Sequence, residues 1–290
     1  MGQLGTVVVV GVGLIGGSVG LTIRARSLAG RVIGVGRSEA SLAEAAKVGA
    51  LDEYTLDLRE AVAGADVVVV CTPVSLVASA VLIASRHGPS NLLITDAGST
   101  KRIIVETVEQ TLQARAMFVG GHPIAGSERK GAAHADGSLF DGRVCVLTPT
   151  ISTPSDRLER ARAFWSALGC RVVELNPTTH DEMLALTSHL PHALAAALAA
   201  TVPFEALGLA AGAYRDGTRV AGADAELWSS IFLQNRDPLL RAIACFEDQF
   251  ATFRAALETG DDGVLQSWWR IAQSRRLQFE AGQDRPAVEH

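Results

Sequence analysis

Cysteine is scarce and scattered in this chain of 290 residues. Its four cysteines, Cys71, Cys145, Cys170 and Cys245, form no C-x-x-C pair and have no neighbouring histidine at ligand spacing. The pattern is not that of a disulfide framework or of a cysteine-based metal site. We therefore expect reduced, mostly buried thiols, no bound metal and a cytoplasmic location.

An excess of basic charge is also missing. The formal net charge is −5, whereas a surface that binds phosphates needs a basic excess, so nucleic acid is not expected as a partner. No apolar run reaches the length of a bilayer span, and no charged segment precedes an apolar one at the N-terminus, so no membrane association is expected either. The length and the apolar content of 48% predict a sizeable core in two domains.

The most informative stretch is a valine run followed by glycines. Four consecutive valines, 7–10, predict a strand buried on both faces, and a helical pattern follows from residue 18. Between them lies Gly-x-Gly-x-x-Gly, in which Gly11 makes the tight turn, Gly13 admits a pyrophosphate and Gly16 lets the helix pack closely. The context favours a dinucleotide site, which includes Leu14 and Ile15, over a merely structural turn.

The end of the next predicted strand, residues 31–35, bears on the choice of cofactor. In this fold that end meets the adenosine ribose, and NAD-selective sites place Asp or Glu there. This chain has Gly36, Arg37 and Ser38 instead. Without a carboxylate to repel it, a 2′-phosphate can bind the guanidinium and the hydroxyl. We expect NADP in preference to NAD, with use of NAD possible; the alternative is a solvated arginine.

Further strands predicted at 65–71 and 91–95 are each followed by a polar turn and a helix. This alternation predicts a Rossmann-type, doubly wound parallel sheet over residues 1–177. Ligands of such sheets lie beyond the carboxyl ends of the strands, so Thr72 and Pro73 are assigned to the cofactor site. Ser99, in the turn after the second of these strands, could cap the following helix, a role that is compatible with contacting the substrate.

His122 is the candidate catalytic residue. It follows a short predicted strand, 117–119, and stands between two glycines and a proline. That setting leaves little room for a role in core packing. An imidazole titrates near neutral pH, so this histidine suits proton transfer beside a nicotinamide.

The pattern changes after Pro177. Helices are predicted at 180–200, 227–257 and 264–279, with a glycine-rich loop at 212–222 and no strand. We expect an all-α domain over 178–282 and a frayed tail at 283–290. Its Ala- and Leu-rich faces are too apolar for a monomer, so we expect it to associate with another surface.

Several strings together resemble the prephenate/arogenate dehydrogenase family, also called cyclohexadienyl dehydrogenases, of tyrosine biosynthesis. The likeness runs in order along nearly the whole chain, except that an Asp common in the family is replaced by Gly36. The matching strings are GVGLIGGS (11–18), DAGSTK (96–101), GHPIAGSE (121–128), SHLPH (188–192), RDGTRVAG (215–222) and LWSSIFLQNR (227–236).

The resemblance implies an NAD(P)-dependent oxidative decarboxylation of prephenate or arogenate in a homodimer. Hydride leaves C4 of the cyclohexadienol for the nicotinamide, the C4 hydroxyl loses its proton to His122, and carbon dioxide departs as the ring aromatises. Ser99 orients the hydroxyl and His122, and Arg219 binds a substrate carboxylate. The further pocket residues implied are Ser127, Ser188, Trp228 and His192, the last in preference to His189.

Two questions stay open at this stage. Arogenate differs from prephenate by an ammonium group, and Asp141 is a candidate to recognise it, although an ordinary turn aspartate is the more expected role. The competing functions are another Rossmann oxidoreductase, of the β-hydroxyacid dehydrogenase or imine reductase type, and a non-enzymatic NADP sensor. The former would more often use a lysine of the second domain, and residues 177–279 contain none.

Overall fold

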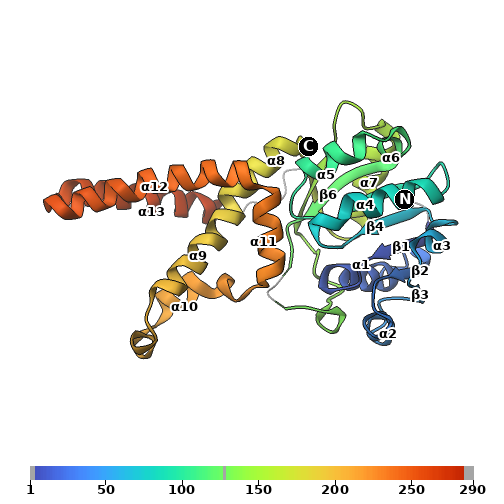
Figure 1. The fold of residues 1–290 in the computed structure, drawn as a ribbon, viewed down its shortest axis with the longest axis horizontal. Helices are drawn as coiled ribbons and strands as arrows, with labels where there is room; N and C mark the ends of the chain where they lie inside the picture. The colour runs from blue at the N-terminus through green and yellow to red at the C-terminus, as the bar shows by residue number, and fades with distance from the viewer. Residues whose placement is uncertain (1–3, 127–128, 284–290) are drawn as a thin grey trace. The chain divides into compact units, whose positions relative to one another are not determined.

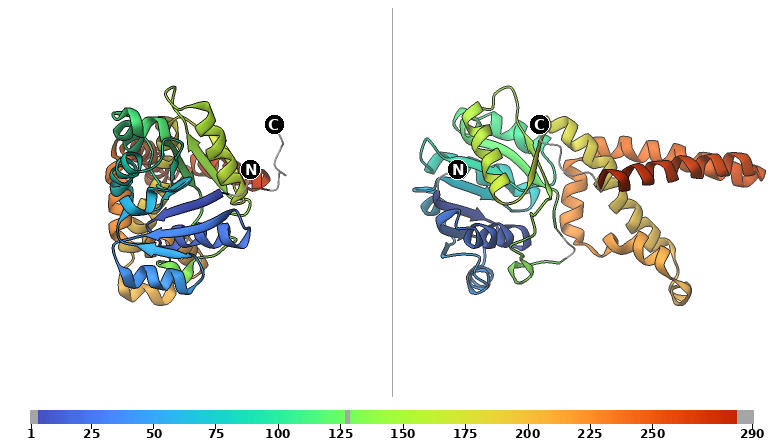
Figure 2. Two further views of the ribbon diagram at one scale, coloured as in Figure 1. Left: turned by 90° about the vertical axis from the view of Figure 1, so that its right-hand side faces the viewer. Right: turned by 180° about the vertical axis from the view of Figure 1, so that it is seen from behind.

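The computed structural model describes residues 4–126 and 129–283. Its centre is an eight-stranded sheet in the order β3-β2-β1-β4-β5-β6-β7-β8, shown with its flanking helices in Figures 1 and 2. The strands are β1 (Leu4–Val10), β2 (Ala29–Val35), β3 (Glu53–Thr55), β4 (Val67–Val70), β5 (Leu93–Asp96), β6 (Phe118–Pro123), β7 (Val144–Thr148) and β8 (Arg171–Glu174).

Valines of β1 and β4 build a separate core on each face of the sheet. Val7 and Val9 face one side and Val8 and Val10 the other, because successive side chains of a strand alternate. The first core packs under α1 (Leu14–Ala25), α2 (Glu39–Lys47) and α7 (Ser155–Ala167). The second packs under α3 (Leu58–Val62), α4 (Val74–His87), α5 (Arg102–Glu109) and α6 (Leu112–Met117). The predicted doubly wound sheet is confirmed.

The sheet departs from the prediction at one pairing. β1 to β6 pair in parallel, but β7 pairs with β6 antiparallel, with His122 opposite Val146. β8 is parallel to β7, so the last two strands run against the first six. β3 is an additional short edge strand that the sequence pattern did not indicate.

The helical part begins after Asn176, whose side chain accepts the Thr179 N–H at 2.8 Å. The single helix predicted at 180–200 is interrupted: α8 (Pro177–Leu184) passes through a π-helical turn, Ala185–His189, into α9 (Leu190–Thr201). Pro191 gives the reason, because its ring cannot sit under the carbonyl four residues earlier in a regular α-helix. The widened turn contains Ser188 and His189, the first two residues of the SHLPH string, and the other three begin α9.

The prediction of a loop at 212–222 is wrong. This segment forms α10 (Gly212–Thr218) and a 3₁₀ turn, Arg219–Gly222. A 3₁₀ segment also precedes it at Phe204–Leu209. The predicted helix 227–257 is two helices, α11 (Ala225–Gln234) and α12 (Arg236–Thr259), separated by the fully buried Asn235. The last helix, α13, spans Asp262–Gln283.

The chain divides into two compact units after Leu239. The division separates two sets of residues that pack among themselves. It does not test the domain boundary predicted after residue 177, which stays a prediction. Of the predicted tail 283–290, Gln283 ends α13 and the other residues lie outside the described part.

The prediction that no apolar run is long enough to span a bilayer needs correction. The continuous helical stretch Pro177–Thr201 has 25 residues and a hydropathy of 1.3, which makes it long and apolar enough to cross a bilayer. Length and composition are weak grounds, because the core helix of a folded protein passes the same test. This stretch carries the buried polar residues His180, Asp181 and His189.

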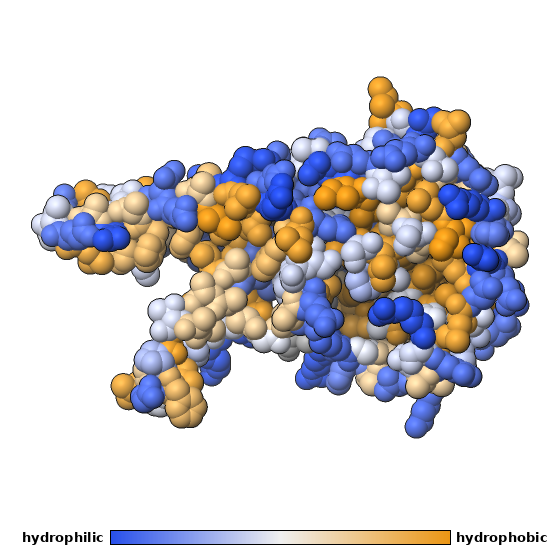
Figure 3. All heavy atoms as spheres, in the orientation of Figure 1, coloured by the Kyte–Doolittle hydropathy of each residue, from blue (hydrophilic) through white to orange (hydrophobic). Residues whose placement is uncertain are grey.

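Large apolar side chains are exposed on both units. Figure 3 shows them along α9 and near α10 in the first unit and along the α12–α13 hairpin. They include Leu198, Phe204 and Leu209 in the first unit and Phe250, Trp269, Ile271 and Phe279 in the second.

Candidate active site

A pocket of about 630 Å³ lies at the carboxyl ends of β1, β2 and β4. We call it the glycine-turn pocket. Of the residues assigned to the cofactor from the sequence, six line it: Gly11, Gly13, Arg37, Ser38, Thr72 and Pro73. Leu14, Ile15 and Gly16 are not in its lining and form the first turn of α1.

The three glycines of the turn have distinct surroundings. Gly11 has φ +88°, and a Cβ there would lie 2.9 Å from the backbone of Cys71 and Thr72. A Cβ on Gly16 would lie 2.2 Å from the Gly11 carbonyl oxygen. At Gly13 no protein atom lies within 4 Å of a built Cβ. Space kept open there, before a helix N-terminus that no side chain caps, fits a bound pyrophosphate.

The ribose end of the pocket carries hydroxyls and a cation and no carboxylate among its lining residues. Ser41 joins Arg37 and Ser38 in the lining, and the Ser38 side chain caps α2 by accepting the Ser41 N–H. At the other side, the Thr72 hydroxyl is buried and has no hydrogen-bond partner among the described residues. A donor in that state is suited to a ligand group.

His122 lies near the end of β6, which is separated by β5 from β4, the nearest strand that carries the pocket. It is buried, with 8% of its surface exposed. Burial lowers its pKa well below 6.5, and the nearby His180, Lys101 and His189 act in the same direction. The ring is therefore neutral at pH 7, the form that can accept a proton.

A buried ion pair fixes the strand end that carries His122. Lys101 and Asp96 form a salt bridge with no exposed side-chain surface. Asp96 also accepts the Gly121 N–H at 3.0 Å, and Lys101 donates to the Gly121 carbonyl at 2.9 Å. A Cβ on Gly121 would lie 2.7 Å from the Asp96 carbonyl oxygen. The glycine before the histidine is thus required by close packing.

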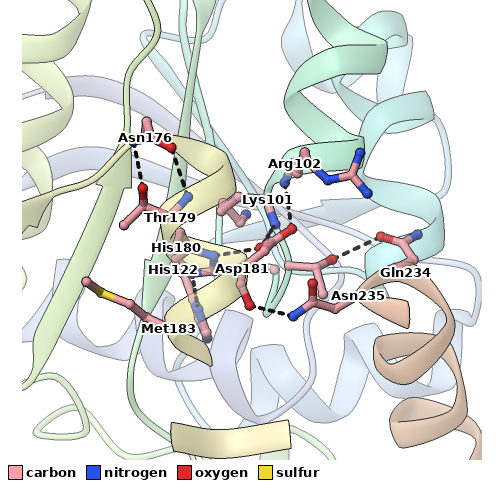
Figure 4. Close-up of polar contacts among 12 residues, drawn as sticks. Lys101, Arg102, His122, Asn176, Thr179, His180, Asp181, Met183, Gln234 and Asn235 are labelled. Atoms are coloured by element: carbon pink, nitrogen blue, oxygen red, sulfur yellow. Dashed lines mark hydrogen bonds and ion pairs between the residues drawn. The ribbon is translucent and has the colours of Figure 1, made fainter. Parts of the chain in front are cut away.

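His180 and Asp181 complete this network, although sequence reasoning missed them. His122 Nδ1 lies 2.8 Å from His180 Nε2, and His180 Nδ1 lies 2.7 Å from Asp181 Oδ1 (Figure 4). Burial lowers the pKa of His180, while Asp181 acts against that shift. The available signal was a His-Asp pair at the start of an otherwise apolar helix. From the sequence alone, such an aspartate is expected to interact within its own helix.

Asp181 instead caps the neighbouring helix α5. Its two carboxylate oxygens accept the Lys101 and Arg102 N–H groups at 2.8 and 3.0 Å. The expectation that Ser99 caps this helix is therefore wrong: its N-cap is Lys101, with no side-chain cap of its own. Ser99 is half-buried in the β5–α5 turn, beside the residues that hold His122.

The residues assigned to the substrate gather on the π turn, α9, the 3₁₀ turn and α11. The rings of His192 and Trp228 stack with centroids 3.6 Å apart. His192 Nδ1 donates to the Ser188 carbonyl at 2.8 Å. Its pKa is lowered, first by burial and also by the charge of Arg219. Ser188, His192 and Trp228 are half-buried and Arg219 is exposed, so this face is more open than the surroundings of His122.

His189 lies deeper than His192. It is 1% exposed, and its Nδ1 accepts from Asn235 Nδ2 at 2.9 Å, an amide nitrogen that also donates to the Asp181 carbonyl. The hydrogen must then be on Nε2, which is buried without a partner among the described residues. Burial lowers its pKa to about 4. The preference for His192 over His189 stays a prediction.

Asp141 lies away from the glycine turn. It forms an ion pair with Arg26, which follows the last residue of α1. The glycine turn is at the other end of that helix, about 18 Å away at 1.5 Å per residue. This pairing fits the ordinary structural role that was the more expected one, and recognition of arogenate by Asp141 stays a prediction. Ser127 lies outside the described residues.

The fold and this site define a class: an α/β oxidoreductase with a Rossmann-type dinucleotide site and a buried histidine on the same sheet. Comparisons with known proteins identify the member of that class. The family model for the prephenate dehydrogenase nucleotide-binding domain matches residues 19–174, and that for its dimerization domain matches residues 176–270. The chain belongs to the prephenate dehydrogenase family.

Individual relatives agree. The chain is 33% identical to prephenate dehydrogenase of Bacillus subtilis, over 93% of this chain and 75% of that protein. Its fold matches prephenate dehydrogenase of A. aeolicus in complex with hydroxyphenyl propionate and NAD+, with a TM-score of 0.88 and 29% identity over 96% and 99% of the two chains. Synechocystis arogenate dehydrogenase matches with a TM-score of 0.80 and 28% identity, over 94% and 99%.

Proposed function

We propose that this chain catalyses the oxidative decarboxylation of prephenate, arogenate or both, with a nicotinamide dinucleotide as the hydride acceptor. Family membership supports the reaction. The observation that carries the assignment to this site is the position of His122, buried and neutral at the end of β6. The strands that carry the glycine-turn pocket lie on the same parallel sheet.

The reaction requires one base and one hydride acceptor. The neutral ring of His122 takes the proton of the C4 hydroxyl while C4 loses a hydride and becomes a carbonyl carbon. The nicotinamide supplies the acceptor for that hydride. The bond between the ring and its carboxylate then breaks, carbon dioxide leaves, and the electron pair makes the ring aromatic. Ser99 is proposed to orient the hydroxyl toward His122.

The decisive assay is direct. The purified protein is incubated with NADP+ or NAD+ and with prephenate or arogenate, and reduced cofactor is followed by its absorbance together with release of carbon dioxide. Formation of both products in equal amounts supports the proposal. Reduction of the cofactor without carbon dioxide would indicate another dehydrogenase, and binding without turnover would indicate a sensor.

For the cofactor we propose NADP in preference to NAD. Arg37, Ser38 and Ser41 supply a guanidinium and two hydroxyls at one end of the pocket, which suits a 2′-phosphate. A Cβ on Gly36 would lie 3.2 Å from Leu42 Cδ2, so a carboxylate side chain there would also need that leucine to shift. A wild-type kcat/KM that is equal or higher with NAD+ would contradict this proposal.

For the substrate we propose a carboxylate contact at Arg219, with Ser188, His192 and Trp228 as further contacts. Support comes from the stacked pair on α9 and α11 and from the charge of Arg219 acting on it. Ser127 keeps its assignment from the family resemblance. A titration of the apo protein with hydroxyphenyl propionate, monitored by Trp228 fluorescence against a Trp228→Phe variant, tests this face.

We also propose a homodimer paired through the helical part. The dimerization-domain match and the exposed apolar residues of the α12–α13 hairpin support it, because such a surface is uncommon on a monomer. Light scattering coupled to size exclusion gives the mass directly. A mass equal to one chain of 30.4 kDa at micromolar concentration would contradict this proposal. The cytoplasmic location predicted from the sequence stays a prediction.

A further inference from the structure

We propose that His180 and Asp181 are positioning residues that set the tautomer of His122, so that its Nε2 is the atom that accepts the substrate proton. This inference rests on the proposed role of His122 as the base. Three bonded groups lead from the base to a helix end: His122, His180 and Asp181 (Figure 4). Each bond restricts where the next hydrogen can be.

The first restriction comes from Asp181. Its carboxylate accepts two backbone N–H groups at the start of α5, at 2.8 and 3.0 Å, where the helix dipole favours a negative charge. With both oxygens acting as acceptors, its contact with His180 Nδ1 at 2.7 Å requires the hydrogen to be on the ring nitrogen.

The second restriction passes through His180. Burial lowers the pKa of His180, so the ring is neutral at pH 7 and carries one hydrogen. That hydrogen is already on Nδ1, so Nε2 has a lone pair. The contact of 2.8 Å with His122 Nδ1 then requires a hydrogen on the His122 side. The ring centroids are 5.1 Å apart and the ring planes are at 62°, so the two rings do not stack face to face.

The result is a defined base. His122 is neutral and holds its hydrogen on Nδ1, so its Nε2 is the free lone pair. When Nε2 takes a proton, the imidazolium keeps its bond to His180, and the negative charge of Asp181 offsets the positive charge through that ring. Without the two residues, the ring could equally hold its hydrogen on Nε2, which is the inactive tautomer for a base.

The alternative is that both residues only hold helices together. Chosen substitutions of His180 and Asp181 separate the tautomer-setting role from the role of holding helices together. His180→Phe removes both ring hydrogen bonds and leaves the carboxylate that caps α5. Asp181→Asn removes the negative charge at the end of the row and keeps one oxygen that can accept a hydrogen bond. Asn176→Ala is the matched control, because Asn176 caps α8 and makes no bond in this row.

The test is the ¹⁵N spectrum of the histidine rings in the labelled full chain with NADP+ bound. The sequence has seven histidines, and His122 is assigned by its loss in His122→Asn. We expect a protonated Nδ1 and a bare Nε2 for His122 in the wild type and in Asn176→Ala, and a hydrogen distributed over both ring nitrogens in His180→Phe. A protonated Nε2 in the wild type, or an unchanged tautomer in His180→Phe, would overturn the inference.

Kinetics provide the second readout. For Asp181→Asn and His180→Phe we expect kcat to fall about 10²–10⁴-fold with KM within about threefold, the pattern of a lost transition-state role. Full activity of His180→Phe would also overturn the inference. The proposed function fails separately, through a His122→Asn variant that retains turnover. The ring spectrum reports the tautomer whichever way that assay falls, so the two failures are distinguishable.

Discussion

The surroundings of His122 and the open face around Arg219 differ in how deeply their polar groups are buried. Around His122 each group is buried and bonded: His180, Asp181, Lys101 and Asp96 are 0–1% exposed. On the open face, Ser188, His192 and Trp228 are half-buried and Arg219 is exposed. The groups around His122 are therefore held in place before any ligand arrives, and the groups proposed to bind the substrate are more accessible. Substitutions on the two sides should separate into effects on kcat and on KM.

The largest effect is expected at His122. His122→Asn keeps a polar side chain of similar reach but no base, so kcat should fall about 10²–10⁴-fold while KM changes little. Steady-state assays with saturating cofactor measure this, with the exposed His87→Asn as the control. Turnover within tenfold of the wild type would place the base elsewhere.

The pH profile sharpens the same point. Because burial lowers the pKa of His122 well below 6.5, the base stays neutral as the pH falls through 6.5. We expect kcat to be flat there and to decline only in more acidic solution, provided the fold persists. A decline centred on pH 6.5 would show that the base is not buried in the active enzyme.

Stability should respond to pH through His189. Its pKa is about 4 in the folded chain against 6.5 as an ordinary value, so below pH 6.5 the unfolded chain takes up a proton that the folded chain does not. The free energy of unfolding is therefore highest above pH 6.5 and falls as the pH drops toward 4, by about 3 kcal/mol for this residue.

Urea unfolding at pH 7.5 and 5 measures that loss. His189→Gln should reduce the difference between the two pH values by more than His192→Gln, since His192 is only half-buried. Equal reductions in the two variants would contradict the contrast between the buried row and the open face.

Arg219→Ala tests the open face. Loss of a guanidinium–carboxylate contact, worth about 1.5–3 kcal/mol, should raise KM for the substrate roughly 10–150-fold and leave kcat within about threefold. Arg219→Lys keeps the charge without the planar fork, so its KM should lie between those of the wild type and Arg219→Ala. A fall in kcat alone would move Arg219 from binding to chemistry.

The smallest effect is expected at Arg37, at the far end of the glycine-turn pocket. Arg37→Ala should raise KM for NADP+ about tenfold, because one exposed charge-assisted contact is lost, and leave KM for NAD+ unchanged. The control is Arg31→Ala, at the other end of β2, which removes only a surface pair with Glu53. Equal changes for the two cofactors would remove Arg37 from cofactor selection.

The sequence alone determined what depends on short, local patterns. The valine run and the glycine spacing set a strand, a turn and a helix in immediate succession, so the dinucleotide site was predictable. His122 could be singled out because the flanking glycines and proline leave little room for a packing role, and its catalytic role stays a prediction. The helices after residue 177 followed from periodicity, although Pro191 and Asn235 broke them at points that only backbone geometry shows.

Only the tertiary structure decided which distant residues complete the site. Asp181 is 79 residues from the Arg102 N–H that it accepts, and His180 is 58 residues from His122, so no local pattern relates them. The same holds for Asp141, whose pairing with Arg26 places it at the other end of α1 from the glycine turn. A hydrogen bond depends on distance in space, and a long loop closes at little extra entropic cost, so partners of this kind leave no periodic trace in the sequence.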